Sequence, residues 1–476
     1  MAGIFNFLKS LIAVIISIVT ISTPLNKSVV GYTDGTPIIA TQREYKYDND
    51  KLLIGAYSFN LKHTDDEHVS WVKEAGIDFL VSNVNEEFLN LCDKYGVGVI
   101  AKAGLELPRY YYNCGDGWLN ISDESVNSIK EHECVWGNSL IDEPHAGGFD
   151  IIGKSVENYY DKLGGNYIPY VNLFPIYAKS EQLGTKSTVT EEQLQDPDFA
   201  WYHEIESVID RYKQHVSEYV NNIDTDYISA DIYPFGFADE KYNTNPLWLR
   251  NLDILAEACR ETDRDLWVIT QAFGDYPGTD GWRRTDTADI RMQAYVTLSF
   301  GAKAIIHACY DGGFVDKDTN MIDTNGNKTE VYTAVQTVNN ELKAFADIYG
   351  QYENHGAYIA GDNTKSAFFM SSGNMAVQYL YNYELQNFAP VDRQYKPTVF
   401  GTDPVLVGCF SGDDGSSAYT IVNMAERNEN KSSKSTLVFD EEKEITVYRK
   451  GVASTVKARS ITLQLETFEG VFVTVK

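Results

Sequence analysis

Two adjacent acids, Asp142 and Glu143, close the apolar stretch 135–144, whose sequence is VWGNSLIDEP. This stretch is typical of a buried strand in a parallel sheet, where both faces are covered and strict alternation is lost. Carboxylates at the end of such a strand are costly unless they face a solvated cleft, and in α/β folds that cleft lies at the carboxyl ends of the strands. The pair has the chemistry that proton transfer needs. The plainer alternative is a strand end with two solvated acids.

Around this strand, apolar strands and helical segments alternate over roughly 300 residues. Eight such repeats favour a (β/α)₈ barrel over an open, doubly wound sheet. The predicted strands are 52–59, 77–83, 97–104, 135–144, 167–175, 226–235, 266–274 and 302–311. The predicted helices are 65–75, 86–96, 123–133, 151–163, 201–220, 246–259, 288–300 and 331–348.

The pattern changes after residue 349, where short stretches alternate at period two between turn residues. This predicts an all-β sandwich. Our fold class is therefore a (β/α)₈ TIM barrel followed by an all-β sandwich domain. The domains are 1–22, a signal peptide or N-terminal anchor; 23–50, a linker with a short strand near 36–41; 51–349, the barrel; and 350–476, the sandwich.

The predicted strand ends carry amides, carboxylates and tyrosines, which a barrel brings together at one mouth. Each has a structural alternative, such as capping a helix or lying in a polar loop. A purely structural rim has no reason to collect this chemistry, so we expect a binding site for a polar ligand. The residues are Tyr57, Asn83, Lys102, Asp142, Glu143, Asn172, Tyr177, Asp231, Tyr233, Gln271, Tyr310 and Asp311.

The ending LIDEP resembles the Asn-Glu-Pro ending of strand four in clan A glycoside hydrolases. The segments VNLFP, SADIYPF and AYVTLSFGAKAI resemble secreted members with a C-terminal β-sandwich, and the similarity in organisation spans about residues 52–350. The resemblance implies that Glu143 is the acid/base that protonates the departing glycosidic oxygen. It also implies that Asp142, in place of the usual asparagine, accepts a hydrogen bond from the sugar 2-hydroxyl.

One position departs from that family. Its nucleophilic glutamate ends strand seven, whereas this strand reads VITQAFG and offers the neutral Gln271. We favour Asp231 as the second catalytic carboxylate, with Asp311 next and Asp275 as a further candidate. The separation of the two carboxyls decides between retaining and inverting hydrolysis. The expected sugar-binding residues are Tyr57, Asn83, Lys102, Asp142, Asn172, Tyr233, Gln271 and Tyr310.

The acidic composition limits the classes of partner that this protein can bind. The 476 residues include 68 acids and 40 bases, which gives a net charge of −28 and argues against nucleic acid as a partner. An apolar run after Lys9 is short for a spanning helix and is typical of a signal peptide, with an uncleaved anchor as the alternative. We therefore expect a secreted or cell-surface protein whose only membrane attachment is this segment.

The six cysteines lack metal-site spacing, and Cys92, Cys134, Cys259 and Cys309 lie in apolar patterns typical of core residues. We therefore expect no metal and no cofactor. The resulting interpretation is a secreted glycoside hydrolase that cleaves β-linked poly- or oligosaccharides. The alternatives are a non-catalytic carbohydrate-binding protein with an inactive barrel, and an exported structural protein whose barrel binds nothing.

Overall fold

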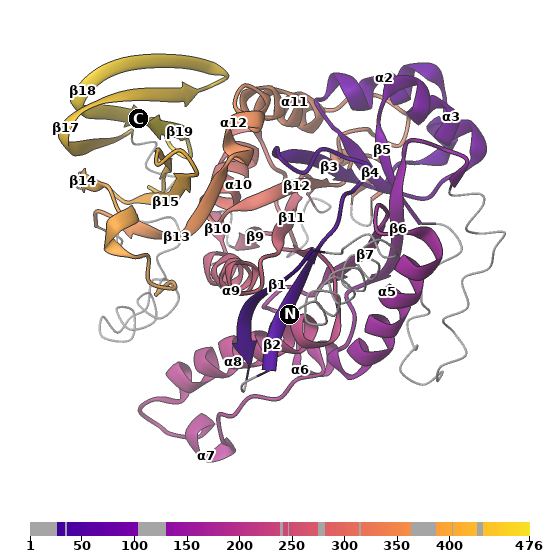
Figure 1. Cartoon of the computed structure of the whole chain (residues 1–476), viewed down its shortest axis with the longest axis horizontal. Coiled ribbons are helices and arrows are strands. Elements are labelled where there is room, and N and C mark those ends of the chain that lie inside the picture. The colour runs from indigo at the N-terminus through magenta and orange to yellow at the C-terminus, as the bar shows by residue number, and fades with distance from the viewer. Residues whose placement is uncertain are drawn as a thin grey trace, which may run out of the picture.

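The protein contains a barrel with an antiparallel sheet beside it (Figure 1). The computed structural model describes residues 26–33, 36–102, 130–238, 241–245, 247–274, 281–313, 316–362, 387–401, 403–425 and 432–476. Residues 1–22 and most of the predicted helix 123–133 lie outside these ranges. Within the described residues, no helix combines the length and the hydropathy needed to cross a membrane.

The barrel closes from eight parallel strands that follow one another in chain order, which confirms the predicted (β/α)₈ architecture. Its strands are β3 (Leu53–Tyr57), β4 (Phe79–Ser82), β5 (Gly98–Ala101), β6 (Val135–Asp142), β7 (Ile168–Leu173), β8 (Tyr227–Asp231), β11 (Asp265–Gln271) and β12 (Ala302–Ala308). Its main helices are α2 (Asp66–Glu74), α3 (Glu86–Tyr95), α5 (Phe149–Leu163), α8 (Ala200–Asn222), α9 (Leu247–Thr262), α10 (Thr287–Ser299) and α11 (Glu330–Lys343), followed by the short α12 (Ala346–Gly350). Short helices α6 (Ser180–Leu183) and α7 (Glu191–Leu194) precede α8.

Local sequence explains where these elements begin and how the barrel is filled. The Asn85 side chain caps α3 by accepting from Phe88 N–H, and Gly96 ends the helix in the left-handed conformation. Aromatic rings fill the barrel interior, and Gly98 on β5 makes room for one of them. A Cβ atom at Gly98 would lie 2.2 Å from Cε2 of Trp136. Interior packing therefore holds the strands in the register that brings their carboxyl ends to one mouth.

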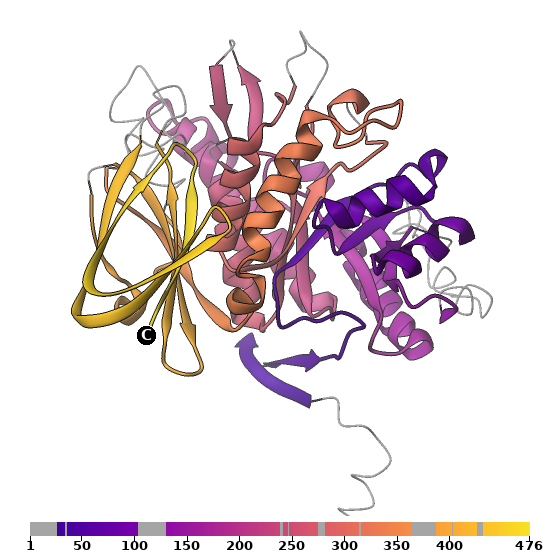
Figure 2. The same ribbon diagram turned by 90° about the horizontal axis from the view of Figure 1, so that it is seen from above.

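The C-terminal part is one curled antiparallel sheet (Figure 2). Its order is β13-β15-β16-β19-β17-β14, and β18 pairs with β17. The strands are β13 (Tyr352–Ala360), β14 (Thr398–Phe400), β15 (Val405–Gly412), β16 (Ser417–Asn423), β17 (Ser433–Arg449), β18 (Val452–Leu465) and β19 (Gly470–Val475). The predicted all-β module is confirmed, with every described strand in a single sheet. Residues 376–385 of the predicted sandwich, AVQYLYNYEL, also alternate at period two and lie outside the described residues.

The sheet packs closely on helix α10 of the barrel. Gly470 on β19 lies against Tyr295, where a Cβ atom would come within 2.3 Å of the ring carbon Cγ. The Thr420 hydroxyl of β16 donates a hydrogen bond to the Ser299 hydroxyl over 2.7 Å. These contacts fix the sheet against the outside of the barrel, away from its mouth.

Two hairpins were not expected in this form. Hairpin β1 (Asn26–Thr33) and β2 (Thr36–Gln42) occupies the predicted linker, and β9 (Phe235–Ala238) and β10 (Lys241–Thr244) follow β8. The two hairpins lie at opposite ends of the barrel (Figure 2). The β9–β10 hairpin therefore marks the mouth, where the strands end, and β1–β2 marks the base.

Candidate active site

Three acids end two of the barrel strands, and one amide joins them. Asp142 is the last residue of β6, Glu143 follows it, and Asp231 is the last residue of β8. On β7, which lies between these strands, the Asn172 side-chain nitrogen donates to Asp142 Oδ1 over 3.0 Å and to Asp231 Oδ1 over 2.9 Å. The structure therefore brings together predicted site residues from strands four, five and six.

The orientation of this amide is fixed from below. The Ser229 hydroxyl donates to the side-chain oxygen Oδ1 of Asn172 over 3.0 Å, and this contact directs the amide nitrogen toward the two carboxylates. The Tyr170 and Ser229 hydroxyls lie 2.8 Å apart and continue the chain of hydrogen bonds. Neither Ser229 nor Tyr170 is among the site residues predicted from the sequence. Each stands two residues before a predicted site residue, so the two-residue period of a strand places it on the same inner face.

Tyr57 and Lys102 hold the other side of Asp142. The Tyr57 hydroxyl donates to Asp142 Oδ2 over 3.1 Å, and Lys102 Nζ donates to the Tyr57 hydroxyl oxygen. The Lys102 ammonium also lies 4.0 Å from the centre of the Tyr57 ring. Burial raises the pKa of Tyr57, and the neighbouring Asp142 charge raises it further. Asn83, the predicted residue after β4, is exposed.

The surroundings of Asp231 change its pKa relative to that of an ordinary surface acid. Asp231 is only 8% exposed, whereas Asp142 and Glu143 are exposed. Burial raises the pKa of Asp231 well above its usual range, and the charges of Glu143 and Asp142 raise it further, against the opposing hydrogen bond from Asn172. Burial and like charges therefore both favour the protonated form of the Asp231 carboxyl.

Glu143 has an uncommon backbone conformation. Its φ angle is +50°, in the left-handed region, which costs a non-glycine residue about 1–2 kcal/mol. The Glu143 N–H donates to the backbone carbonyl of Asn172 over 2.8 Å, and this bond links Glu143 to β7. Strain of this kind persists where the surrounding structure holds a side chain in a required direction. The turn therefore presents Glu143 from a backbone fixed by the neighbouring strand.

Aromatic side chains flank Asp231. Tyr233 packs edge-on against Phe273 and Trp282, with ring centres 4.9 and 5.9 Å apart. Tyr177 is 36% exposed. Burial raises the pKa of both Tyr177 and Tyr233, and the Asp231 charge is the next contribution in each case. Tyrosine and tryptophan rings of this kind offer flat apolar faces together with polar edges.

The structure corrects the prediction for Gln271. Its side chain is fully buried, with Nε2 donating to the carbonyls of Phe235 over 3.2 Å and Arg283 over 3.1 Å. Its Oε1 accepts from Phe235 N–H over 3.0 Å. Gln271 therefore fastens the chain segments around the end of β11 and does not line a sugar subsite.

The structure also corrects the predictions that Asp311 is a catalytic candidate and that Tyr310 binds the sugar. Asp311 is 2% exposed and lies 2.7 Å from Nδ1 of His63, and its charge contacts are with His63 and His68 rather than with the three acids. Tyr310 is fully buried, stacks on Phe59 and donates to the His68 carbonyl over 3.3 Å. Asp311 belongs to a separate histidine cluster, and Tyr310 belongs to the core. The further candidate Asp275 lies outside the described residues.

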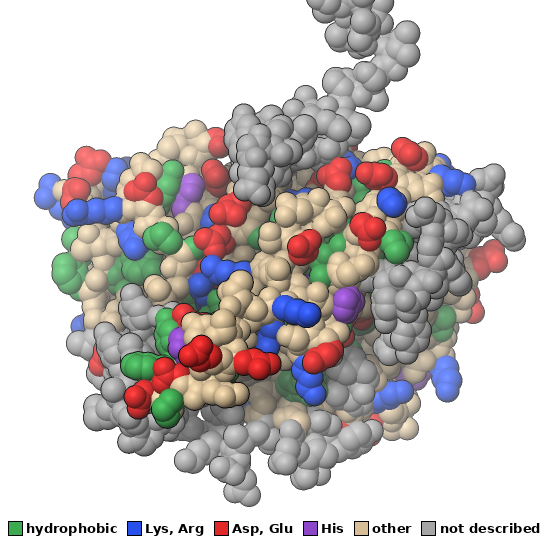
Figure 3. Space-filling model, turned by 90° about the horizontal axis from the view of Figure 1, so that it is seen from below, with side chains coloured by type: hydrophobic (Ala, Val, Ile, Leu, Met, Phe, Trp, Pro, Cys, Tyr) green, Lys and Arg blue, Asp and Glu red, His purple; other side chains and the backbone are tan. Residues whose placement is uncertain are grey.

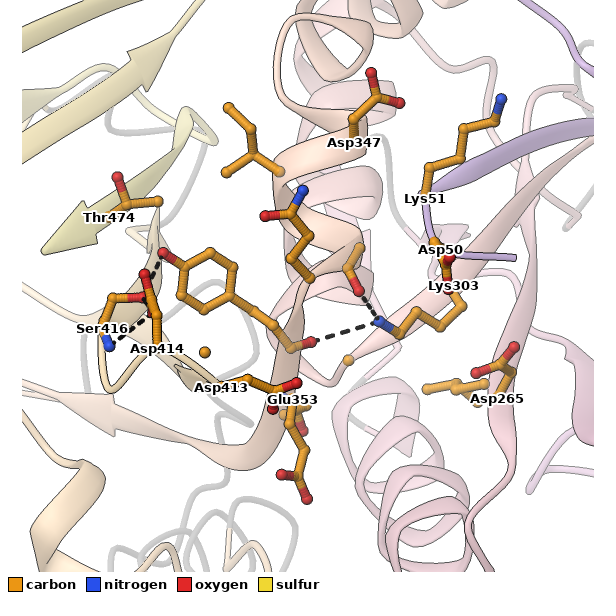
Figure 4. A pocket seen from close by; sticks show the side chains of 18 of the residues that line it. Asp50, Lys51, Asp265, Lys303, Asp347, Glu353, Asp413, Asp414, Ser416 and Thr474 are labelled. Atoms are coloured by element: carbon orange, nitrogen blue, oxygen red, sulfur yellow. Dashed lines mark hydrogen bonds between the residues drawn. The ribbon is translucent and has the colours of Figure 1, made fainter. Parts of the chain in front are cut away.

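A cavity of about 1230 Å³ lies between the base of the barrel and the C-terminal sheet (Figure 4). Asp265, at the start of β11, and Lys303, near the start of β12, contribute to its wall. Lys303 Nζ donates to the carbonyls of Gly350 and Tyr352 over 3.0 and 3.4 Å. None of the predicted site residues lines this cavity. Because barrels place their chemistry at the carboxyl ends of strands, we assign the functional site to the mouth.

Among the described residues, the donors close enough to hold a metal ion belong to one group, Asp93, His132 and Cys134, which lies away from the mouth. The expected absence of a metal and of a cofactor is not tested by this arrangement. The predicted core cysteines Cys92, Cys134, Cys259 and Cys309 are all buried.

Neither a family model nor a curated protein matches this sequence. Solved structures with a similar arrangement include a catalytic mutant of Gan42B, a GH42 β-galactosidase from G. stearothermophilus, with 9% identity and a TM-score of 0.48 over 91% of this chain and 99% of that one. A glucosidase from Croceicoccus marinus has 11% identity and a TM-score of 0.38 over 89% and 95% of the two chains. A glycoside hydrolase family 5 protein from Bacteroides vulgatus has 9% identity and a TM-score of 0.39 over 91% of this chain and 93% of that one. At these TM-scores, the fold assignment rests on the strand order of the barrel itself.

Proposed function

We propose that this chain is a glycoside hydrolase that cleaves β-linked poly- or oligosaccharides, with Glu143 and Asp231 as its catalytic carboxyls. The observation that carries the proposal is the Asn172 amide, which bridges the Asp142 and Asp231 carboxylates at the barrel mouth. Glycoside hydrolysis uses one protonated and one ionised carboxyl. Buried Asp231 and exposed Glu143 supply such a pair.

The proton belongs to the pair rather than to one residue. The Glu143 charge raises the pKa of Asp231 after burial, so the two carboxyls titrate together. In the complex Glu143 donates the proton shared by the pair to the departing glycosidic oxygen as the bond from that oxygen to the anomeric carbon breaks. Once the proton has left, the negative charge of the pair stabilises the positive charge that develops on the sugar ring. A water molecule then adds to the anomeric carbon and returns its proton to the ionised pair.

The remaining mouth residues would orient the sugar. Tyr57 and Asn172 each occupy one oxygen of Asp142, which leaves further lone pairs for a sugar hydroxyl. Tyr177, Tyr233 and Trp282 would provide the apolar faces against which a sugar ring packs. On the face shown in Figure 3, the described Lys and Arg side chains stand among Asp and Glu and form no continuous basic patch. With a net charge of −28, the protein suits a neutral carbohydrate better than a polyanion.

The test is hydrolysis of a panel of β-glucans, galactans and mannans by wild type, Glu143→Gln and Glu133→Gln, with product anomers followed by NMR. Glu133 is an exposed glutamate just before β6, so it gives the same chemical change at the other end of that strand. We expect Glu143→Gln to lose about 10²–10⁴-fold in rate and Glu133→Gln to match wild type. Unchanged hydrolysis by Glu143→Gln would remove this residue from the mechanism.

A carbohydrate-binding protein without catalysis is the second candidate. The observation that favours it is Gln271, because β11 ends in a neutral side chain locked into the wall. In that case wild type would bind oligosaccharides saturably in calorimetry and cleave none, and Asp142→Ala would weaken the binding. Turnover by wild type would exclude this candidate.

We also propose export, supported by the apolar run in residues 1–22. Fractionation of expressing cells, with N-terminal sequencing of the product, distinguishes a cleaved signal peptide from a retained anchor. A product found only in the cytosol would contradict export.

A further inference from the structure

Three metal-ligating side chains of different chemistry meet at the base of the barrel. Asp93 lies in the last turns of α3, and His132 and Cys134 come just before β6. One carboxylate oxygen, one ring nitrogen and the thiol sulfur all lie within 4.8 Å of one another. We propose that Asp93, His132 and Cys134 form a binding site for a divalent transition-metal ion, with Zn²⁺ as the best-matched ion.

The donor set defines the class of ion. A sulfur, an imidazole nitrogen and a carboxylate oxygen suit Zn²⁺ and Co²⁺ better than Ca²⁺ or Mg²⁺, which prefer oxygen ligands alone. Tetrahedral Zn²⁺, with bonds of about 2.0–2.3 Å, separates its donor atoms by roughly 3.3–3.8 Å. Donors already within 4.8 Å reach this spacing through small side-chain rotations. Three protein ligands leave the fourth position for water.

The present contacts already orient the ligands. Asp93 Oδ1 accepts from the Cys134 N–H over 2.7 Å, and Asp93 Oδ2 lies 2.8 Å from His132 Nδ1. The thiol of Cys134 donates to the Leu89 carbonyl over 3.5 Å. An ion would replace the contact between Oδ2 and Nδ1, while the bond to the backbone N–H would keep Asp93 in place. The competing interpretation is that this hydrogen-bonded clasp is complete without an ion.

The location indicates a structural role. The eight residues of β6 separate this site from Asp142 by roughly 25 Å. An ion bound here would link α3 to the start of the strand that carries the proposed catalytic acid. Because such a site forms only in the folded chain, ion binding should stabilise the fold without taking part in the reaction at the mouth.

The experiment uses the full chain, stripped of metal with a chelator and then titrated with Co²⁺. We expect one equivalent to bind, with a near-ultraviolet thiolate-to-cobalt absorption band that Zn²⁺ abolishes by displacement, and with a higher thermal midpoint. Cys134→Ser should abolish the band. Cys409→Ser is the matched control, because Cys409 is a buried cysteine of the C-terminal sheet, and this variant should keep the band.

His132→Asn provides an independent readout should Cys134→Ser fail to fold, because the His132 side chain is partly exposed. We expect this variant to weaken Co²⁺ binding at least about tenfold. Even the loss of a residue that only supports a metal ligand commonly lowers metal affinity by about this factor. The absence of a thiolate band in wild type would overturn the proposal. A band that survives in Cys134→Ser, or unchanged affinity in His132→Asn, would do the same.

Discussion

The two ends of the barrel both contain an acid with a raised pKa, but the charges around each acid differ. At the mouth, burial and the like charges of Glu143 and Asp142 raise the pKa of Asp231. At the base, burial raises the pKa of Asp265 to about 6, and the largest charge acting on it is the opposing Lys303. Lys303 is in turn held by backbone carbonyls.

At the mouth the neighbouring charges act in the same direction as burial, whereas at the base the largest charge acts against burial. Lys303 opposes the effect of burial on Asp265 and hydrogen-bonds to the carbonyls of Gly350 and Tyr352, at the junction between barrel and sheet. The like charges at the mouth add to the effect of burial on Asp231 and favour its protonated form, at an energetic cost to the fold. Such an arrangement is characteristic of functional sites. A cavity of about 1230 Å³ lies at the base, whereas the cluster of three acids lies at the mouth.

The largest contrast is expected between Asp231→Asn and Asp265→Asn. Both changes remove an ionisable carboxyl with a raised pKa, but only Asp231 belongs to the proposed catalytic pair. We expect Asp231→Asn to lower kcat/KM about 10²–10⁴-fold, as loss of a general acid or base does, and Asp265→Asn to remain near wild type. Steady-state kinetics on the best substrate of the panel measure both. Equal losses of kcat/KM in two folded variants would show that the acid at the mouth matters no more for the reaction than the acid at the base.

The junction between barrel and sheet can be weakened without touching the mouth. In Gly470→Ala, the new methyl group would meet the Tyr295 ring at 2.3 Å. We expect a loss of about 1–3 kcal/mol in unfolding free energy, the usual cost of overpacking. Denaturant unfolding measures this loss, with kcat per folded molecule unchanged. The control is Gly165→Ala, whose Cβ would make an ordinary contact of 3.7 Å with Arg43; a similar loss there would contradict the packing argument.

A smaller effect should follow from removing one charge at the mouth. Asp142→Asn takes a negative charge away from Asp231, and loss of a like charge favours the ionised carboxyl and lowers its pKa. The pair then loses its proton at lower pH, so the alkaline limb of kcat/KM should move down by up to about one pH unit. A pH–rate profile measures the limb. A shift toward higher pH would show that Asp142 does not act on this proton.

The smallest effect concerns two histidines in different surroundings. Partial burial lowers the pKa of His68, near the mouth, but hydrogen bonds to Asp65 and to the Gly326 carbonyl outweigh it, so its pKa is raised. Burial lowers the pKa of His355, in the sheet. NMR titration should therefore find that His68 loses its proton at higher pH than His355. The stabilising contacts of protonated His68 should weaken as pH rises through its raised pKa. The reverse order would contradict these environments.

The sequence predicts the barrel well because its eight strands and the helices between them give strong local signals in a regular order. It also predicts that Asp142, Asn172 and Asp231 meet, because the carboxyl ends of neighbouring parallel strands share one rim. Position at a strand end does not determine what a side chain contacts, and this explains the errors at Gln271 and Tyr310. Gln271 is captured by carbonyls of two other segments, and Tyr310 packs between barrel and helices. The β9–β10 hairpin was missed because residues 235–244 are largely polar and show no sustained apolar alternation.

The most direct test of the account is a crystal structure of Glu143→Gln soaked with a β-linked oligosaccharide from the panel. The account predicts that the sugar lies at the mouth, with a hydroxyl on Asp142 and its glycosidic oxygen beside residue 143 and Asp231. A sugar bound in the cavity between barrel and sheet, with the mouth empty, would contradict it and move the functional site to the base.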